Sequence, residues 1–256
     1  MKKIIALFTV AFIMLTSGVG MAGEKLRIAT EGAYPPFNFI GPDGKLAGSD
    51  VDVANALCEA MGAECELMAQ DWDGMIPGLL AKKYDLIVAS MSITEKRKKA
   101  VNFSNPYYQA PAQFVTLKVS GLTTSKAGLK GKKIGVQRAT TYANYLESVH
   151  GNSIEIVYYD TVENHNLDLT AGRLDAVLAQ AIYMGGVLKK PEGKNFEFVG
   201  EMIWDQKYIG VGAGIAIRKQ DTDLLKQVDA ALAKIIANGT HKTIFQKYFK
   251  FDLYKY

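Results

Sequence analysis

The chain alternates between two hydrophobic patterns, one typical of β-strands and one typical of amphipathic helices. Short apolar runs bounded by turn residues predict strands, and apolar residues three and four apart predict helices between them. In the first half, the predicted strands are residues 25–30, 64–68 and 84–89, and the predicted helices are 51–61 and 74–81. After Pro111 the order repeats, with strands at 132–137, 154–158 and 174–179 and helices at 140–149 and 162–171. This alternation indicates an α/β protein with parallel, doubly wound sheets flanked by helices.

The two halves also resemble each other weakly in sequence. Residues 80–90 (LAKKYDLIVAS) align with 170–180 (TAGRLDAVLAQ), which pairs Asp85 with Asp175, and residues 27–31 (RIATE) align with 133–137 (KIGVQ). Ligands of open α/β sheets bind beyond the carboxyl ends of the strands. We therefore expect one ligand between the halves to contact the residues at those ends, which are Glu31, Ser90, Gln137 and Gln180. Generic βαβ composition is the alternative explanation of this similarity.

The first 22 residues have the pattern of a secretory signal peptide. Lys2 and Lys3 precede an apolar run over residues 4–15, small residues follow, and we expect cleavage after Ala22. The run is too short for a permanent membrane anchor, and no cysteine follows it as a lipoprotein signal requires. No later segment reads as transmembrane. We therefore expect a soluble protein exported to the periplasm.

Composition narrows the class of partner. Removing Lys2 and Lys3 lowers the number of basic residues from 30 to 28, against 26 acidic residues. A net charge this close to zero argues against nucleic acid as the partner.

Cys58 and Cys65 are the only cysteines of the sequence, and in an exported chain they predict a disulfide between a helix end and the next strand. Two thiols and three scattered histidines make a poor zinc site. We expect neither a metal nor another cofactor.

The stretch from Ser90 to Arg97 (SMSITEKR) predicts a carboxylate-binding turn between a strand and a helix. Ser92 with Glu95 fits a capping box, and Thr94 is a second possible cap. Free backbone N–H groups at such a turn favour an anion, and the guanidinium of Arg97 matches a carboxylate in shape and charge. The alternative is an ordinary capped helix with a solvated basic face over residues 96–99.

Eight motifs spread over almost the whole mature chain resemble the periplasmic solute-binding proteins of amino-acid ABC importers. The resemblance is greatest to the branch that binds lysine, arginine, ornithine, histidine and opines. The motifs are residues 28–37 (IATEGAYPPF), 48–52 (GSDVD), 71–77 (DWDGMIP), 91–97 (MSITEKR), 103–107 (FSNPY), 131–137 (GKKIGVQ), 168–175 (DLTAGRLD) and 239–240 (GT). Their number and order make the resemblance far more specific than any single motif.

This resemblance implies the two-lobed, type II periplasmic-binding-protein fold, whose lobes close over a ligand. Lobe 1 would comprise residues 23–110 and 213–256, and lobe 2 residues 111–206. Two crossing segments, at about 109–113 and 206–213, would form the hinge. The resemblance also implies binding without catalysis by a monomer that delivers its ligand to an inner-membrane ABC permease.

The same resemblance assigns roles to residues of the site. Arg97 would bind the α-carboxylate of an amino acid, helped by Ser92 and by the hydroxyl and N–H groups of Thr140 and Thr141. Glu31 would pair with the cationic end of the ligand, because a buried charge without a partner is costly. Two aromatic residues would enclose the ligand stem, with core packing as their alternative role. The complete expected set is Glu31, Tyr34, Trp72, Ser90, Met91, Ser92, Arg97, Gln137, Thr140, Thr141 and Gln180, in which Tyr34 and Trp72 are the aromatic pair.

Two departures from the family pattern leave the ligand open. Relatives that bind plain α-amino acids have an aspartate where this chain has Gln180, and a neutral amide cannot neutralise the α-ammonium. Opine-binding relatives also lack this acid, so Gln180 is consistent with an opine ligand. The other explanation of Gln180 is simple sequence drift, with a water molecule bridging the gap to the α-ammonium. Ala89 with Met91 replaces the serine and leucine more usual in arginine or lysine binders. Arginine, lysine and ornithine are therefore candidates, with an octopine- or nopaline-type opine as the rival.

An enzyme is the alternative from another class. Some proteins that resemble this family are cyclohexadienyl dehydratases, which need an acid in the cleft. Glu31 is the one candidate, and a receptor for cations explains it without chemistry. The sequence contains no Ser/His/Asp or Cys/His set, phosphate loop or metal cluster. We expect no enzymatic activity.

Overall fold

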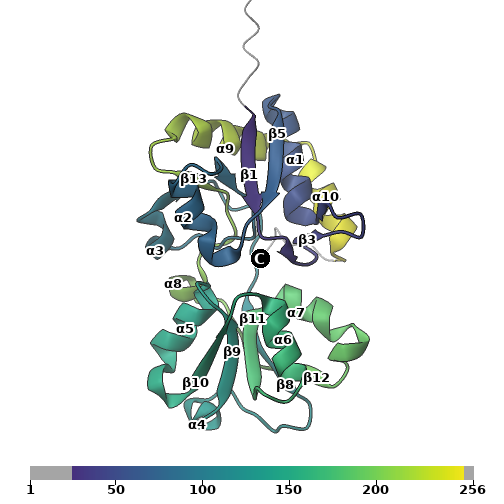
Figure 1. Ribbon diagram of the computed structural model, residues 1–256, viewed down its shortest axis with the longest axis vertical. Coiled ribbons are helices and arrows are strands. Elements are labelled where there is room, and N and C mark those ends of the chain that lie inside the picture. The colour runs from purple at the N-terminus through teal and green to yellow at the C-terminus, as the bar shows by residue number, and fades with distance from the viewer. Residues whose placement is uncertain (1–24, 251–256) are drawn as a thin grey trace, which may run out of the picture.

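The computed structural model describes residues 25–250, which form two lobes stacked along the long axis of the molecule (Figure 1). Each lobe is built on one five-stranded sheet, which confirms the two-lobed α/β fold predicted from the sequence. In the first sheet the order is β5 (Cys65–Ala69), β1 (Leu26–Thr30), β6 (Leu86–Ile87), β13 (Ala216–Arg218) and β7 (Val101–Phe103). In the second it is β10 (Glu155–Tyr159), β9 (Lys133–Gln137), β11 (Ala176–Gln180), β8 (Ala112–Leu117) and β12 (Phe196–Ile203). A small third sheet consists of β2 (Ala33–Tyr34), β3 (Asn38–Ile40) and β4 (Leu46–Ala47).

Helices cover both faces of each large sheet (Figure 1). On the first sheet, one face carries α1 (Ser49–Met61), α9 (Thr222–Ala237) and α10 (Thr240–Tyr248), and the other carries α2 (Met75–Leu80). On the second sheet, one face carries α6 (Val162–Thr170) and α7 (Ala181–Leu188), and the other carries α5 (Thr141–Val149). The remaining short helices are α3 (Glu95–Lys98), α4 (Lys126–Leu129), α8 (Gln206–Ile209), η1 (Trp72–Gly74), η2 (Gly151–Ser153) and η3 (Pro191–Gly193).

This two-sided cover explains why the central strands have apolar residues at consecutive positions. Successive side chains of a strand point to opposite faces. Ile28 of β1 packs in the cluster under α1 and α9, whereas its neighbour Ala29 packs in the cluster under α2. Leu86 and Ile87 of β6 divide in the same way. A strand buried on both faces therefore shows a continuous apolar run rather than alternation.

The two halves that align in sequence also share a pair of hydrogen bonds at equivalent positions. The N–H of Arg27 donates to the carboxylate of Asp85 at 3.1 Å, and the N–H of Asp85 donates to the carbonyl of Arg27 at 2.8 Å. Lys133 and Asp175 form the same pair of bonds, at 2.8 and 2.9 Å. In each lobe an aspartate therefore ties the start of the third parallel strand to the start of the first.

The prediction of wholly parallel sheets is wrong for one strand in each lobe. β13 runs antiparallel to β6 and β7, and β8 runs antiparallel to β11 and β12. Both are the first strands that the chain forms after it passes from one lobe to the other. Because the parallel strands end at the gap between the lobes, a strand entering from that gap must run the opposite way. The sequence pattern had assigned neither of them.

Other local predictions have clear outcomes. The disulfide between Cys58 and Cys65 is confirmed, and it joins the last turn of α1 to the first residue of β5 with Cα atoms 6.2 Å apart. The signal peptide predicted for residues 1–22 lies outside the described residues. Within residues 25–250, no helix has the length and apolar character needed to cross a membrane.

Candidate functional site

Nine of the eleven residues predicted to bind the ligand line one cavity between the two lobes. Free space in its interior amounts to about 20 Å³, room for about one water molecule. An amino acid therefore fits only after the lobes separate or the lining side chains withdraw. The predicted residues in the lining are Glu31, Tyr34, Trp72, Ser90, Ser92, Arg97, Gln137, Thr140 and Thr141, and Ala89 and Tyr142 complete it.

Glu31 lies just beyond the carboxyl end of β1 and is buried. Its Oε1 accepts a hydrogen bond of 2.6 Å from Nε2 of Gln137, which ends β9 in the opposite lobe. Burial is the main cause that raises the pKa of Glu31 to about 7; the Gln137 bond lowers it in part, and the charges of Asp71 and Asp50 raise it further. Within residues 25–250, no lysine, arginine or histidine forms an ion pair with this carboxylate. The site therefore presents a buried acid that a cationic ligand would satisfy.

Arg97 lines the same cavity. Its guanidinium donates to the carbonyl of Ser92 at 2.9 Å and, across the lobes, to the carbonyl of Ala139 at 3.2 Å. The guanidinium carbon lies 5.3 Å from the ring centroid of Trp72, in cation–π geometry. Burial lowers the pKa of Arg97 to about 10, so the side chain remains charged at neutral pH. No carboxylate of the described chain pairs with it.

The capping box predicted at Ser92 is wrong. The side chain of Thr94 caps α3, accepting a hydrogen bond of 3.2 Å from the N–H of Arg97. Ser92 instead forms an isolated β-bridge with Ala213, which holds it out of the helix. Because α3 has only four residues, its dipole is small. The positive charge at this turn comes from the Arg97 guanidinium.

Thr140 departs from its predicted role in part. Its hydroxyl donates to the carbonyl of Gln137 at 2.7 Å and accepts from the N–H of Ala143 at 3.1 Å, so it caps α5. That hydroxyl is therefore already used. The first N–H groups of α5, at Thr141 and Tyr142, have no partner within a helix and remain able to bind an anion.

The two predicted aromatic residues have different surroundings. The ring of Tyr34 stacks on Tyr183 of the opposite lobe, with centroids 4.7 Å apart and an interplanar angle of 8°. Tyr34 also stacks on Phe37, so it belongs both to the core and to the cavity wall. Trp72 faces Arg97, and its buried Nε1 has no hydrogen-bond partner in the described part of the chain.

Met91 and Gln180 lie outside this cavity. The side chain of Met91 is 1% exposed and packs in the core between the first sheet and α2. Gln180 borders a smaller neighbouring cavity that shares Ser90, Ser92 and Tyr142 with the main one. Nε2 of Gln180 donates to the hydroxyl of Tyr108 at 3.0 Å. Its Oε1 is buried without a partner among residues 25–250.

Two residues of the site had no assigned role. Tyr142 lines the cavity, and burial raises its pKa to about 12; its position directly after Thr141 at the start of a helix was the available signal. Asp50 is buried behind the cavity wall and accepts hydrogen bonds from Asn38 at 2.7 Å, Ser90 at 2.8 Å and Tyr107 at 2.7 Å. Burial raises the pKa of Asp50, and these three bonds oppose the shift.

The Asp50 network supports a strained residue of the cavity wall. Ser90 has a left-handed backbone, with φ of 53°. Such a conformation is unfavourable for a residue with a side chain and persists only when its surroundings hold it. The Ser90 hydroxyl bonds to Asp50, and the Ser90 N–H donates to the hydroxyl of Tyr107 at 3.0 Å. Asp50 and Tyr107 therefore fix Ser90 in place.

Known proteins are similar to this chain in sequence and in fold. The model for bacterial extracellular solute-binding proteins, family 3, matches residues 26–251. An L-arginine-binding protein of Pseudomonas aeruginosa is 45% identical over 99% of both chains, and an octopine-binding periplasmic protein of Rhizobium meliloti is 36% identical over 95% of this chain and 96% of its own. Among solved structures, a Salmonella typhimurium periplasmic binding protein of high arginine specificity superposes with a TM-score of 0.82 and 38% identity, covering 89% of this chain and 100% of its own. The resemblance seen in the sequence is thus confirmed, and the chain belongs to family 3 of the bacterial extracellular solute-binding proteins.

Proposed function

We propose that this protein is the periplasmic binding component of an ABC importer for a basic amino acid, namely arginine, lysine or ornithine. One observation carries the proposal: Glu31 and Arg97 have opposite charges and border the same cavity between the lobes. Neither forms an ion pair within residues 25–250. Similarity to the L-arginine-binding protein of Pseudomonas aeruginosa supports arginine as the first candidate.

The ligand's two ends match these two charges. Its α-carboxylate binds the guanidinium of Arg97 and the N–H groups of Thr141 and Tyr142 at the start of α5. Its ammonium or guanidinium binds Glu31 and replaces the neutral amide of Gln137 as the hydrogen-bond donor. Burying a charge without a partner is costly, so a ligand that neutralises both residues gains more than one that neutralises neither.

Binding proceeds by closure of the two lobes. Lobe 1, with Glu31 and Arg97, captures the ligand, and lobe 2, with Gln137 and Thr141, closes over it. Contacts between the lobes support such a closed state, among them the hydrogen bond of 2.8 Å from Lys96 to Asn144. We assign residues 23–110 and 213–256 to lobe 1 and 111–206 to lobe 2, with the closed monomer as the form that the permease recognises.

A second candidate ligand is an opine, an amino acid with a substituted α-amine and a further carboxylate. The observation that favours it is the environment of Gln180. Its buried Oε1 has no hydrogen-bond partner in the described chain, and the small cavity beside it adjoins the main one. The substituted amine of an opine is also protonated, but the opine's own second carboxylate compensates its charge. A neutral amide at residue 180 then needs only to accept a hydrogen bond from it.

Thermal-shift and calorimetric titrations with a panel of ligands test both candidates. The panel is arginine, lysine, ornithine, histidine, octopine, nopaline and glutamine. Stabilisation by the basic amino acids but not by glutamine supports the main proposal. Stabilisation by octopine or nopaline alone makes the chain an opine-binding protein.

We also infer that the protein has no catalytic activity, in line with the relatives, which are binding proteins. The enzyme alternative depends on Glu31 acting as an acid in the cleft. Incubation with prephenate, followed by ultraviolet absorbance, separates the two. Turnover that disappears in Glu31→Gln would make the chain a dehydratase.

A further inference from the structure

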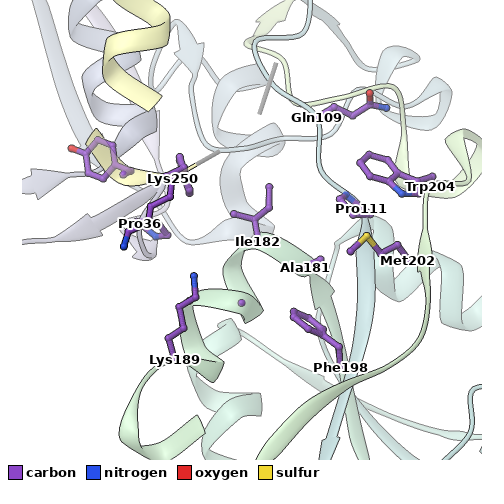
Figure 2. A pocket seen from close by; sticks show the side chains of 14 residues that line it. Pro36, Gln109, Pro111, Ala181, Ile182, Lys189, Phe198, Met202, Trp204 and Lys250 are labelled. Atoms are coloured by element: carbon purple, nitrogen blue, oxygen red, sulfur yellow. The ribbon is translucent and has the colours of Figure 1, made fainter. Parts of the chain in front are cut away.

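A larger, apolar groove of about 360 Å³ lies where the chain crosses between the lobes (Figure 2). Gln109 and Pro111 of the first crossing line it, together with Trp204 at the end of the second lobe. Figure 2 shows Ile182 of α7 near the centre of the view and Phe198 of β12 below it, and both line the groove. None of its lining residues belongs to the ligand cavity. The groove is therefore a separate site.

Two adjacent glycines keep this groove open. Gly185 and Gly186 lie inside α7, where each glycine costs about 0.5–1 kcal/mol relative to alanine. A Cβ at Gly186 would have no atom within 4 Å, and one at Gly185 would meet only the ring of Phe198 at 3.9 Å. Neither close packing nor a left-handed backbone requires glycine here. Their effect is to leave the wall of the groove bare.

The end of the described chain runs directly into this groove. Phe249 is buried against Phe37 and Phe245, which anchors the chain up to the rim, and Lys250 lies on the rim itself (Figure 2). The next six residues, 251–256, read FDLYKY. Extended, six residues reach about 20 Å, enough to enter the groove from Lys250.

We propose that residues 251–256 occupy this groove and strap lobe 1 to lobe 2. Phe251, Leu253 and Tyr254 supply apolar side chains for a largely apolar wall, which includes Met202, 54% exposed. Asp252 is complementary in charge to Lys189, which Figure 2 shows at the edge of the groove. Lys250 follows α10 of the first lobe, whereas α7 and β12 belong to the second. The strap is therefore a third connection between the lobes, beside the two crossings.

Disulfide trapping tests this proposal in the full chain. Gly186→Cys has open space for the new side chain and is paired with Leu253→Cys. The control pairs Leu253→Cys with Val119→Cys, which is 92% exposed beyond the far end of β8. The native cysteines are already joined and do not compete. We expect the groove pair to close within one chain about tenfold or more faster than the control pair, because docking raises its effective concentration.

Equal rates for the two pairs would overturn the proposal, and so would disulfides formed between molecules, which would mean that a second copy fills the groove. A second measurement uses Trp204 as a probe, in a Trp72→Phe background that leaves it the only tryptophan. Removing residues 251–256 should increase acrylamide quenching of Trp204, because the strap no longer covers the groove. Unchanged quenching would also contradict the proposal.

Discussion

Gln137 and Glu31 join the two lobes through a hydrogen bond of 2.6 Å from Nε2 to Oε1. The two residues hold equivalent places in the aligned halves, since each lies at the carboxyl end of the corresponding parallel strand of its own lobe. One lobe contributes an acid at this place and the other a neutral amide. The contact therefore leaves the charge of Glu31 without a counterion, and a cationic ligand can supply what Gln137 cannot.

Glu31→Gln should weaken binding of arginine, lysine or ornithine. Among the described residues that line the cavity, Glu31 is the one acidic side chain. Loss of a buried charge partner costs about 2 kcal/mol or more, roughly 30-fold in Kd. Isothermal titration calorimetry measures the effect. Glu95→Gln is the matched control, because the Glu95 side chain is 87% exposed on the same lobe. Equal affinities in the wild type and Glu31→Gln would refute the role given to Glu31.

The affinity for a cationic ligand should rise with pH. In the ligand-free protein the pKa of Glu31 is about 7, so below this pH the carboxyl is protonated and must lose its proton when the cation binds. Calorimetry in buffers of different ionisation enthalpy should reveal proton release near pH 6 that disappears in Glu31→Gln. A pH-independent affinity between pH 5.5 and 8 would count against this coupling.

Glu31 should also make the stability of the ligand-free protein depend on pH, but this stability should fall as the pH rises, whereas the affinity for ligand increases. Its folded pKa, about 7, is above the ordinary value of 4.5, so folded Glu31 holds its proton more tightly than unfolded Glu31. Its contribution to the free energy of unfolding is therefore greatest below the ordinary pKa and declines as the pH rises towards 7. Urea unfolding of ligand-free wild type and Glu31→Gln should show a difference that grows in favour of the variant over this range.

Arg97→Lys should reduce affinity for every α-amino acid ligand. Lysine keeps the positive charge but lacks the planar pair of N–H donors and the flat group that faces Trp72. We expect Kd to rise roughly tenfold or more. Lys98→Met, on the exposed face of the same short helix, serves as control and should bind normally. If Arg97→Lys kept the affinity of the wild type, a group other than Arg97 would bind the α-carboxylate of the ligand.

Gln180→Asp should improve binding of simple basic amino acids and weaken binding of opines. The new carboxylate can neutralise a free α-ammonium, whereas it repels the second carboxylate of an opine. Gln180→Asn, which changes the length without adding charge, separates the two effects and should give no improvement. If Gln180→Asp leaves both ligand classes unchanged, the α-amine does not approach this position.

Asp50→Ala should destabilise the protein. The substitution leaves the donors of Asn38, Ser90 and Tyr107 without their acceptor in a buried place, and we expect a loss of about 3 kcal/mol in the free energy of unfolding. Urea denaturation without ligand measures it. Asp43→Ala, in an exposed turn, should change stability by less than about 0.5 kcal/mol. A similarly small change for Asp50→Ala would show that the network carries little stability.

One part of the site, at the ends of strands, could be predicted from the alignment of the two halves. Aligning Asp85 with Asp175 identified equivalent strands, and the ends of parallel strands meet at one edge of a sheet. Glu31, Ser90, Gln137 and Gln180 could be grouped in this way before any contact was known. The first three line the cavity, whereas Gln180 borders only the neighbouring one. The family motifs added Arg97, which lines the main cavity as well.

Other parts depended on which partner each group finds in space. Thr94, not Ser92, caps α3, because Ser92 pairs with Ala213 from the far end of the chain. The hydroxyl of Thr140 is taken by its own helix, and Met91 points into the core. The sequence around these residues would be the same whether their side chains faced the ligand or bonded within the protein. The sequence alone therefore could not distinguish the two.

The sequence by itself determined the alternation of strands and helices, the disulfide and the family, because periodicity, spacing and motif order are properties of neighbouring residues. Only the tertiary structure decided the direction of β8 and β13, which follows from where the chain enters each lobe. It also decided the pairing of Glu31 with Gln137, 106 residues apart, and the bonds that surround Asp50. The first contact forms where the two lobes meet, and the bonds to Asp50 form where distant segments of lobe 1 pack together. No local pattern encodes either approach.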